Sequence, residues 1–269
     1  MRINVLGPLE ARHGGNLIPL AGMKQRVFLS SLALHPRAAV PVSVLVDALW
    51  GAAPPRTART KVHAHVYELR KALGAYRGSQ PEGWPVVTGQ NGYQLSSDVE
   101  LDTWEFEHNA SRARLASRRG QYSQASDFFG RAMTIWRGPA LADVESDAIQ
   151  AAASALNEER LLAIEGKAEA DLKLGWFDEV VADLMPVAAA NPLRERLRGQ
   201  LMLALYRRGC RNEALAVYRD GHQAIARELG LPPGPQLRRL QQFVYRDDPA
   251  LWTQPPNSLL TMGTIVGEA

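Results

Sequence analysis

The sequence predicts an α+β chain, in which a small mixed region of strands and helices precedes a region that is almost entirely helical. Short β-like runs and turn signals are confined to about residues 1–97, and helical periodicity prevails from about Asp98 onward. The charge changes at the same place: residues 1–97 hold 11 Lys and Arg against four acids, a net +7, and the other residues hold 20 against 24, a net −4. A basic first region indicates a polyanionic partner for that region, with chance clustering as the alternative. The expected domains are 1–97, 98–246 and a flexible tail, 247–269.

The composition excludes several broad classes of protein. Of the 269 residues, 46% are hydrophobic and 22% are charged, which is ordinary for a globular protein and excludes a mainly disordered chain. No run approaches the roughly 18 apolar residues of a membrane helix, and the first residues lack the apolar core of a signal peptide. Cys210 is the single cysteine, so no internal disulfide can form. We therefore expect a cytoplasmic protein that does not associate with membranes.

The first region begins with short β-like runs separated by turn signals at Gly7-Pro8 and Gly14-Gly15. Helical segments follow, and the first ends before His35-Pro36 because proline disfavours helix in the residue that precedes it. The expected strands are Arg2–Leu6, Leu9–Arg12 and Leu17–Leu20, and the expected helices are Met23–Leu34, Val42–Trp50 and Thr57–Leu73.

A hairpin is expected after the third helix. Asn91-Gly92 stands between the apolar runs Pro85–Thr88 and Tyr93–Ser96, and Asn-Gly in this setting is a strong hairpin signal. Strands, three helices and a hairpin follow one another in the order of a winged helix-turn-helix with an N-terminal antiparallel sheet. In that fold the third helix reads DNA.

The third helix has an apolar stripe backed by a polar face. At 100° per residue, one face collects Ala58, Val62, Val66, Leu69 and Leu73. Small, hydroxyl and cationic side chains occupy the other face, which favours entry into a major groove about 12 Å wide. An amphipathic surface helix with a solvated basic face is the alternative. The polar face and its flank comprise Thr57, Thr60, Lys61, His63, Ala64, Tyr67, Arg70 and Lys71.

The helical region contains a repeat. Gly120, Gly175 and Gly209 are each followed by small or apolar residues five, nine and twelve positions later, and the last two glycines are 34 residues apart. This is the tetratricopeptide period, and such arrays build concave surfaces for protein partners. We interpret Trp104, Trp136 and Trp176 as packing residues between helices.

Many short segments resemble the Streptomyces antibiotic regulatory protein family, whose members join an OmpR-type winged helix to a tetratricopeptide-like bacterial transcriptional activation domain. Each segment is modest alone, but their order from about residue 3 to residue 240 is specific. The segments are Val5-Leu6-Gly7, Leu32-Ala33-Leu34-His35, Val40-Pro41-Val42-Ser43, Leu49-Trp50-Gly51 with Pro54-Pro55, Leu69-Arg70-Lys71-Ala72-Leu73, Gly92-Tyr93-Gln94-Leu95, the run from Trp136 to Val144, Glu158-Glu159-Arg160-Leu161, Pro192-Leu193-Arg194-Glu195-Arg196-Leu197, the run from Gln200 to Arg207, and Glu228-Leu229-Gly230-Leu231.

The resemblance implies a transcriptional activator of a biosynthetic gene cluster, such as an antibiotic cluster. It would bind direct repeats in promoter DNA, usually as a dimer, and contact RNA polymerase holoenzyme with its sigma factor. The chain looks like a small, two-domain member. No cofactor or metal is implied.

The resemblance also assigns the DNA contacts. It identifies the third helix as the recognition helix and the hairpin as a wing without Lys or Arg at its tip. Lys24 and Arg26 are expected to reach phosphate or, equally, to be solvated. The recognition-helix residues are Arg56, Arg59, Thr60, Lys61, His63, Ala64, Tyr67 and Lys71, and the wing residues are Gln90, Asn91 and Tyr93.

Other functions remain as alternatives. His63 and His65 point about 200° apart on a helix, and no further ligand completes a metal set. No nucleophile has an evident base, so we expect no enzyme. A helical-repeat scaffold whose basic region docks a protein is the stronger rival. A repressor would use the same DNA-binding module, because activation rests on the resemblance of the second domain.

Overall fold

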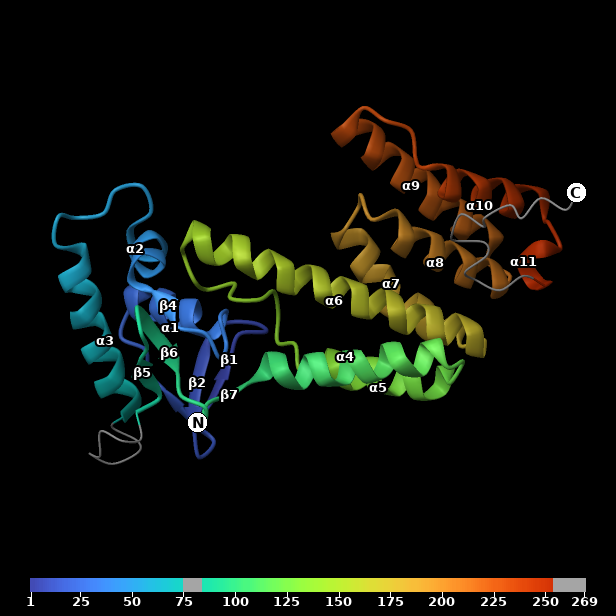
Figure 1. The fold of residues 1–269 in the computed structure, drawn as a ribbon. Coiled ribbons are helices and arrows are strands. Elements are labelled where there is room, and N and C mark those ends of the chain that lie inside the picture. Colours follow the sequence, from blue (N-terminus) through green and yellow to red (C-terminus); the bar gives the residue numbers. More distant parts are fainter. Residues whose placement is uncertain (75–83, 254–269) are drawn as a thin grey trace, which may run out of the picture. The chain divides into compact units, whose positions relative to one another are not determined.

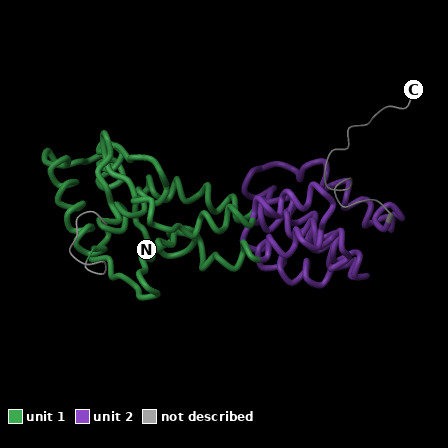
Figure 2. The backbone as a smooth tube through the Cα atoms, turned by 60° about the horizontal axis from the view of Figure 1, so that its bottom comes forward, with its two compact units in different colours: residues 1–109, 131–161 green, residues 110–130, 162–269 purple. Residues whose placement is uncertain are grey.

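The computed structural model describes residues 1–74 and 84–253. The chain forms two compact units, coloured separately in Figure 2. Unit 1 comprises residues 1–109 and 131–161, and unit 2 comprises residues 110–130 and 162–269. The boundary between the units is therefore not a single position near residue 97, because residues 131–161 belong to the first unit again.

Unit 1 contains two small sheets and three helices of the winged helix-turn-helix (Figure 1). One sheet has the strand order β3-β2-β1-β7, in which β7 pairs parallel with β1, and the other has the antiparallel order β4-β6-β5. The helices are α1 (Met23–Ala33), α2 (Val42–Trp50) and α3 (Ala58–Gly74), and the strands are β1 (Arg2–Asn4), β2 (Glu10–His13), β3 (Asn16–Ile18), β4 (Val40–Pro41), β5 (Val86–Thr88), β6 (Gly92–Leu95) and β7 (Glu100–Leu101).

These elements confirm the predicted fold class and the predicted order. The strands β4 and β7 were not predicted, because each has two residues and so carries no measurable alternation. The apolar stripe of α3 is buried against α1 and α2, as the helical period predicts. Its members, Ala58, Val62, Val66, Leu69 and Leu73, are at most 6% exposed.

A loop that follows α5 (Tyr122–Thr134) is attached to the first sheet of unit 1. The backbone N–H of Arg137 donates to the carbonyl of Leu6 (2.8 Å), and the N–H of Leu141 donates to the carbonyls of Val5 (3.1 Å) and Gly7 (2.8 Å). Gly7 has φ +145°, and a Cβ there would lie 2.9 Å from Cβ of Arg137. The glycine thus permits the close approach of the two backbones, which sequence patterns did not reveal.

Unit 2 is helical in the residues that the structure describes. The glycines of the predicted repeat, Gly120, Gly175 and Gly209, have φ of +72°, +80° and +83° and precede the second helix of each pair. The residues five positions later, among them Ala125 and Val180, are fully buried. These features confirm the tetratricopeptide-like part of the prediction. The helices of this region are α4 (Asp102–Arg118) and α5, both shared between the units, α6 (Asp147–Leu174), also shared, then α7 (Phe177–Ala190), α8 (Glu195–Arg207), α9 (Arg211–Leu229), α10 (Pro235–Arg246) and α11 (Ala250–Thr253).

The three tryptophans differ in their surroundings. Trp136 is 8% exposed and its ring meets Phe106 edge-on, as expected for a packing residue. The packing interpretation is wrong for Trp176, which is 39% exposed. Trp176 is the N-cap of α7 and so lies at the turn between α6 and α7. Trp104 is half-buried beside a cavity that is described below.

The first residues of the expected tail are folded. The hydroxyl of Tyr206 donates to Asp247 (2.5 Å), Leu251 of α11 is fully buried, and the ring of Trp252 packs on Tyr206. The remainder of that predicted tail, residues 254–269, lies outside the described residues.

Candidate nucleic-acid interface

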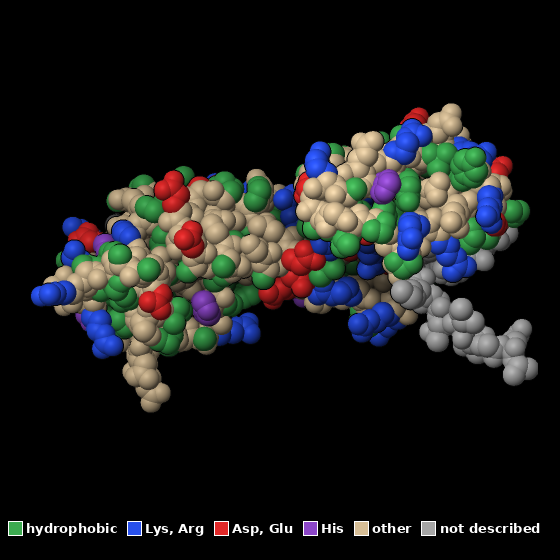
Figure 3. Space-filling model, turned by 90° about the horizontal axis from the view of Figure 1, so that it is seen from above, with side chains coloured by type: hydrophobic (Ala, Val, Ile, Leu, Met, Phe, Trp, Pro, Cys, Tyr) green, Lys and Arg blue, Asp and Glu red, His purple; other side chains and the backbone are tan. Residues whose placement is uncertain are grey.

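The exposed face of α3 carries most of the predicted DNA contacts. Because the apolar stripe anchors the opposite face, these side chains project away from unit 1, and Tyr67 is 59% exposed. In Figure 3, blue Lys and Arg side chains gather at the left edge, over α3 and the loop before it. The predicted residues that the structure leaves exposed here are Arg56, Arg59, Thr60, Lys61, His63, Ala64, Tyr67 and Lys71.

Four cations of this face and of the loop before it have no side-chain partner among the residues that the structure describes. Among the described residues, the side chains of Arg56, Arg59, Lys61 and Lys71 make no hydrogen bond and no salt bridge. Elsewhere in unit 1, exposed cations such as Arg2 and Arg12 pair with carboxylates. An array of uncompensated cations on one helix face attracts a polyanion and leaves every donor available to it.

The β5-β6 hairpin is joined to α3 by a hydrogen bond. The Tyr93 hydroxyl lies 2.6 Å from Nδ1 of His63, and the two rings meet edge-on. Tyr93 is 6% exposed, so the structure brings it to α3 rather than to the outer surface of the wing. Gln90 and Asn91 are exposed in the hairpin turn, which the N–H of Gly89 closes on the carbonyl of Gly92 (2.9 Å).

Arg70 makes a second connection between α3 and the wing. Its guanidinium donates to the carbonyl of Val86 (2.9 Å) and to Oγ1 of Thr88 (3.0 Å), and it lies over the rings of Trp84 and Tyr93. Burial lowers the pKa of Arg70. Sequence analysis placed this residue only on the flank of the helix. Arg70 lies in the fourth turn of the predicted helix, near the expected hairpin, and this position could have indicated a contact between the two.

The side chain of Lys24 binds the C-terminal end of α2. Its ammonium group donates to the carbonyl of Leu49 and lies over the ring of Trp50, 5.4 Å from the centroid. The same Trp50 ring packs beside His65 of α3, with centroids 6.0 Å apart. Burial, together with the nearby charges of Lys24 and Lys61, lowers the pKa of His65. A neutral imidazole is thereby favoured at this contact between α2 and α3.

Arg26 connects α1 to the attached loop. Its guanidinium donates to the carbonyl of Leu9 (3.1 Å) and forms an ion pair with Asp143. Asp143 also accepts the N–H of Leu9 (2.8 Å), and Ser146 donates to the carbonyl of Ala48 at the end of α2 (2.8 Å). Both α1 and α2 are thus held by the loop at residues 136–146.

No group of three or more His, Cys, Asp and Glu side chains in the described residues is arranged to hold a metal ion. No helix within the described ranges is long and apolar enough to cross a membrane.

Known families and structures resemble this chain along most of its length. The model of the bacterial transcriptional activator domain matches residues 101–244. DnrI of Streptomyces peucetius, a regulatory protein, is 34% identical over 256 residues, which cover 93% of this chain and 94% of DnrI. AfsR of Streptomyces coelicolor is 38% identical over 253 residues, and the chain spans about a quarter of its length (25%).

A solved structure extends the likeness to three dimensions. Mycobacterium tuberculosis EmbR, determined in complex with a low-affinity phosphopeptide, matches with a TM-score of 0.85 and 32% identity, over 96% of this chain and 68% of that one. The family model covers more than half of the chain, and DnrI matches it nearly from end to end. The chain therefore belongs to the Streptomyces antibiotic regulatory protein family of transcriptional activators.

Proposed function

We propose that this protein binds promoter DNA sequence-specifically through α3 and activates transcription of a biosynthetic gene cluster, such as one for an antibiotic. The observation that supports the proposal most directly is the exposed surface of α3 and the loop before it. Among the described residues, the side chains of Arg56, Arg59, Lys61 and Lys71 on this surface have no hydrogen-bonding or ionic partner. The helix enters the major groove with this face, and the cations nearest its ends contact phosphate. The function needs no catalytic step and no cofactor.

The DNA contacts that we propose come from two places, α3 and the wing. Thr60, Lys61, Ala64 and Tyr67 approach base edges, because they combine small or hydrogen-bonding side chains with exposure on one face. Gln90 and Asn91 approach the backbone at the wing. His63 is oriented by Tyr93, and Arg26 and Lys24 act from inside the unit by holding α1 and α2.

We propose that the helical region contacts RNA polymerase holoenzyme, including its sigma factor, and that two copies occupy direct repeats. In this assignment residues 1–97 read DNA, residues 98–246 activate transcription and residues 247–269 form a tail. The protein works in the cytoplasm, at the nucleoid. Repeat-built helical units present extended surfaces suited to protein partners.

Footprinting on promoters of biosynthetic genes, with and without polymerase holoenzyme, tests the whole proposal. We expect protection of spaced direct repeats and increased polymerase occupancy. Protection that excludes polymerase would show a repressor. Absence of salt-dependent duplex binding would favour a scaffold whose basic unit docks a protein.

Lys71→Ala should weaken binding to operator and to scrambled DNA by the same factor. Lys71 lies in the last turn of α3, where it reaches phosphate, and loss of one phosphate contact reduces the slope of log K against log salt by about 0.9. Gel-shift titrations at several salt concentrations measure this slope. Arg119→Ala, which removes an exposed cation of unit 2, should leave it unchanged.

Lys61→Ala and Thr60→Ala should instead change sequence preference. Each loses roughly 1–3 kcal/mol of discrimination at one base position, because a base-edge contact distinguishes base pairs and a phosphate contact does not. The measurement is competition with operator variants changed at single positions. Equal losses on operator and scrambled DNA would remove the base-reading role.

A further inference from the structure

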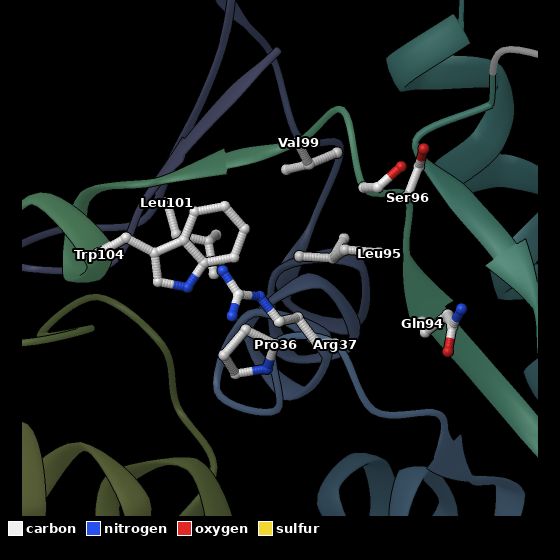
Figure 4. A pocket seen from close by; sticks show the side chains of 9 residues that line it. Pro36, Arg37, Gln94, Leu95, Ser96, Val99, Leu101 and Trp104 are labelled. Carbon is white, nitrogen blue, oxygen red and sulfur yellow. The ribbon is translucent and has the colours of Figure 1, made fainter.

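Unit 1 contains a cavity of about 430 Å³ at the C-terminal end of β6, the end opposite the hairpin turn. It is formed by the turn after α1, the end of β6, β7 and the first turn of α4 (Figure 4). Its volume lies in the range of small-molecule sites, about 300–1,000 Å³. The lining residues are Pro36, Arg37, Gln94, Leu95, Ser96, Ser97, Val99, Leu101 and Trp104.

The interior and the rim of the cavity differ in chemistry. Leu95, Val99 and Leu101 are buried aliphatic residues, and the indole of Trp104 adds a broad apolar wall. Polar groups are placed at the rim, where Ser96 and Arg37 are accessible. An apolar interior with a few convergent polar groups is the usual composition of a ligand site.

Arg37 supplies the charge of this site. Its guanidinium carbon lies 5.0 Å from the centroid of the Trp104 ring, and in Figure 4 the group is directed toward the indole. Among the described residues it has no hydrogen bond and no carboxylate partner. A guanidinium stacked on an indole keeps its in-plane N–H donors free, which suits bidentate binding of a carboxylate.

The backbone at Arg37 is a second, independent observation. Its φ is +67°, in the left-handed region that non-glycine residues rarely adopt. Such strain persists where the surrounding structure imposes it, and it clusters at functional sites. Glycine or asparagine would adopt this turn more readily, so an arginine here is explained by its side chain rather than by the needs of the turn.

We propose that this cavity binds a small organic carboxylate with a planar apolar body. The apolar body packs on Trp104 and the aliphatic wall, and the carboxylate accepts two hydrogen bonds from Arg37. The site is adjacent to the DNA-reading elements, since Val40, three residues after Arg37, pairs with Tyr93, whose hydroxyl meets His63. A ligand bound here would therefore lie close enough to the DNA-reading elements to act as an effector of DNA binding. Binding of the ligand does not itself require DNA.

The test measures binding of 2-naphthoate to the full chain by isothermal titration calorimetry, without DNA. Neutral 2-naphthamide serves as the matched ligand. We expect naphthoate to bind and the amide to bind at least about tenfold more weakly. Arg37→Gln should reduce naphthoate affinity by about the same factor, Trp104→Ala should also reduce it, and Arg119→Gln should leave it unchanged.

Arg37→Gly guards against an effect of misfolding, because it relieves the left-handed backbone while removing the guanidinium. Its thermal midpoint should equal or exceed that of the parent protein, and its naphthoate affinity should fall as in Arg37→Gln. No saturable naphthoate binding, equal affinity for the amide, or full affinity in both Arg37 variants would each overturn the proposal. Because no DNA is present, these outcomes are separate from those of the footprinting experiment.

Discussion

Asp102→Ala is expected to lower the free energy of unfolding by about 3 kcal/mol. Asp102 is 1% exposed, and its carboxylate accepts the backbone N–H groups of Val5 and Leu6, each at 2.9 Å. Both donors are buried, so alanine leaves two unsatisfied N–H groups, each costing about 1–3 kcal/mol. Urea denaturation followed by circular dichroism measures the change. A loss below about 1 kcal/mol would show that water replaces the carboxylate.

The Asp102 carboxyl also gives the stability a defined pH dependence. Burial raises the pKa of Asp102, and this effect exceeds the opposing hydrogen bonds and the charge of Arg137. Between the ordinary pKa of about 3.9 and the raised value, the folded chain holds a proton that the unfolded chain has released. The contribution of this group is thus greatest below the ordinary pKa and is lost as the pH rises through the raised one. Relative to Asp102→Asn, which cannot ionise, the parent protein should lose stability across that window.

Gly92→Ala should cost about 3 kcal/mol or more and should also weaken operator binding. A Cβ at residue 92 would lie 1.8 Å from the carbonyl oxygen of Val40 and 2.6 Å from its carbonyl carbon. The obstruction is backbone, so the pairing of β4 with β6 must open, and overpacking of this kind costs several kcal/mol. The wing then loses the strand that places Tyr93 against His63. Thermal unfolding and gel-shift titration measure the two effects.

Gly74→Ala is the matched control for that substitution. Gly74 is the last residue of α3, and no atom of the described residues lies within 4 Å of a Cβ built there. Alanine has a higher helix propensity, so stability should stay equal or rise by up to about 1 kcal/mol. If both variants unfold alike, the steric explanation for Gly92 is wrong.

The helical period was sufficient to predict which face of α3 is buried and which is exposed. The stripe of Val62, Val66 and Leu69 fixes which face of α3 is buried, and the exposed face follows from it. Alternation in β6 contained a further signal: Tyr93 and Leu95 share one face, and both are buried. Assigning Tyr93 to the outer surface of the wing overlooked that period of two.

The remaining contacts join residues that are far apart in the sequence. Arg26 and Asp143 are separated by 117 residues, and the Val5 N–H and Asp102 by 97. In the sequence Arg26, Asp143 and Asp102 look like ordinary charged residues, because local propensity carries no information about pairing. The short strands β4 and β7 depend on their neighbours in the same way.

The loop at residues 136–146, which is hydrogen-bonded to the first sheet, limits where the chain can be divided into fragments. Val5, Leu6, Gly7 and Leu9 all form backbone hydrogen bonds with residues 102–143. A fragment cut at residue 97 would therefore carry unsatisfied backbone groups along its own sheet. Residues 110–130 lie between the two segments of unit 1, and the second segment ends inside α6, so no continuous fragment consists of unit 1 alone. Chimaeras that exchange regulators of this family should therefore be joined after α6 rather than before α4.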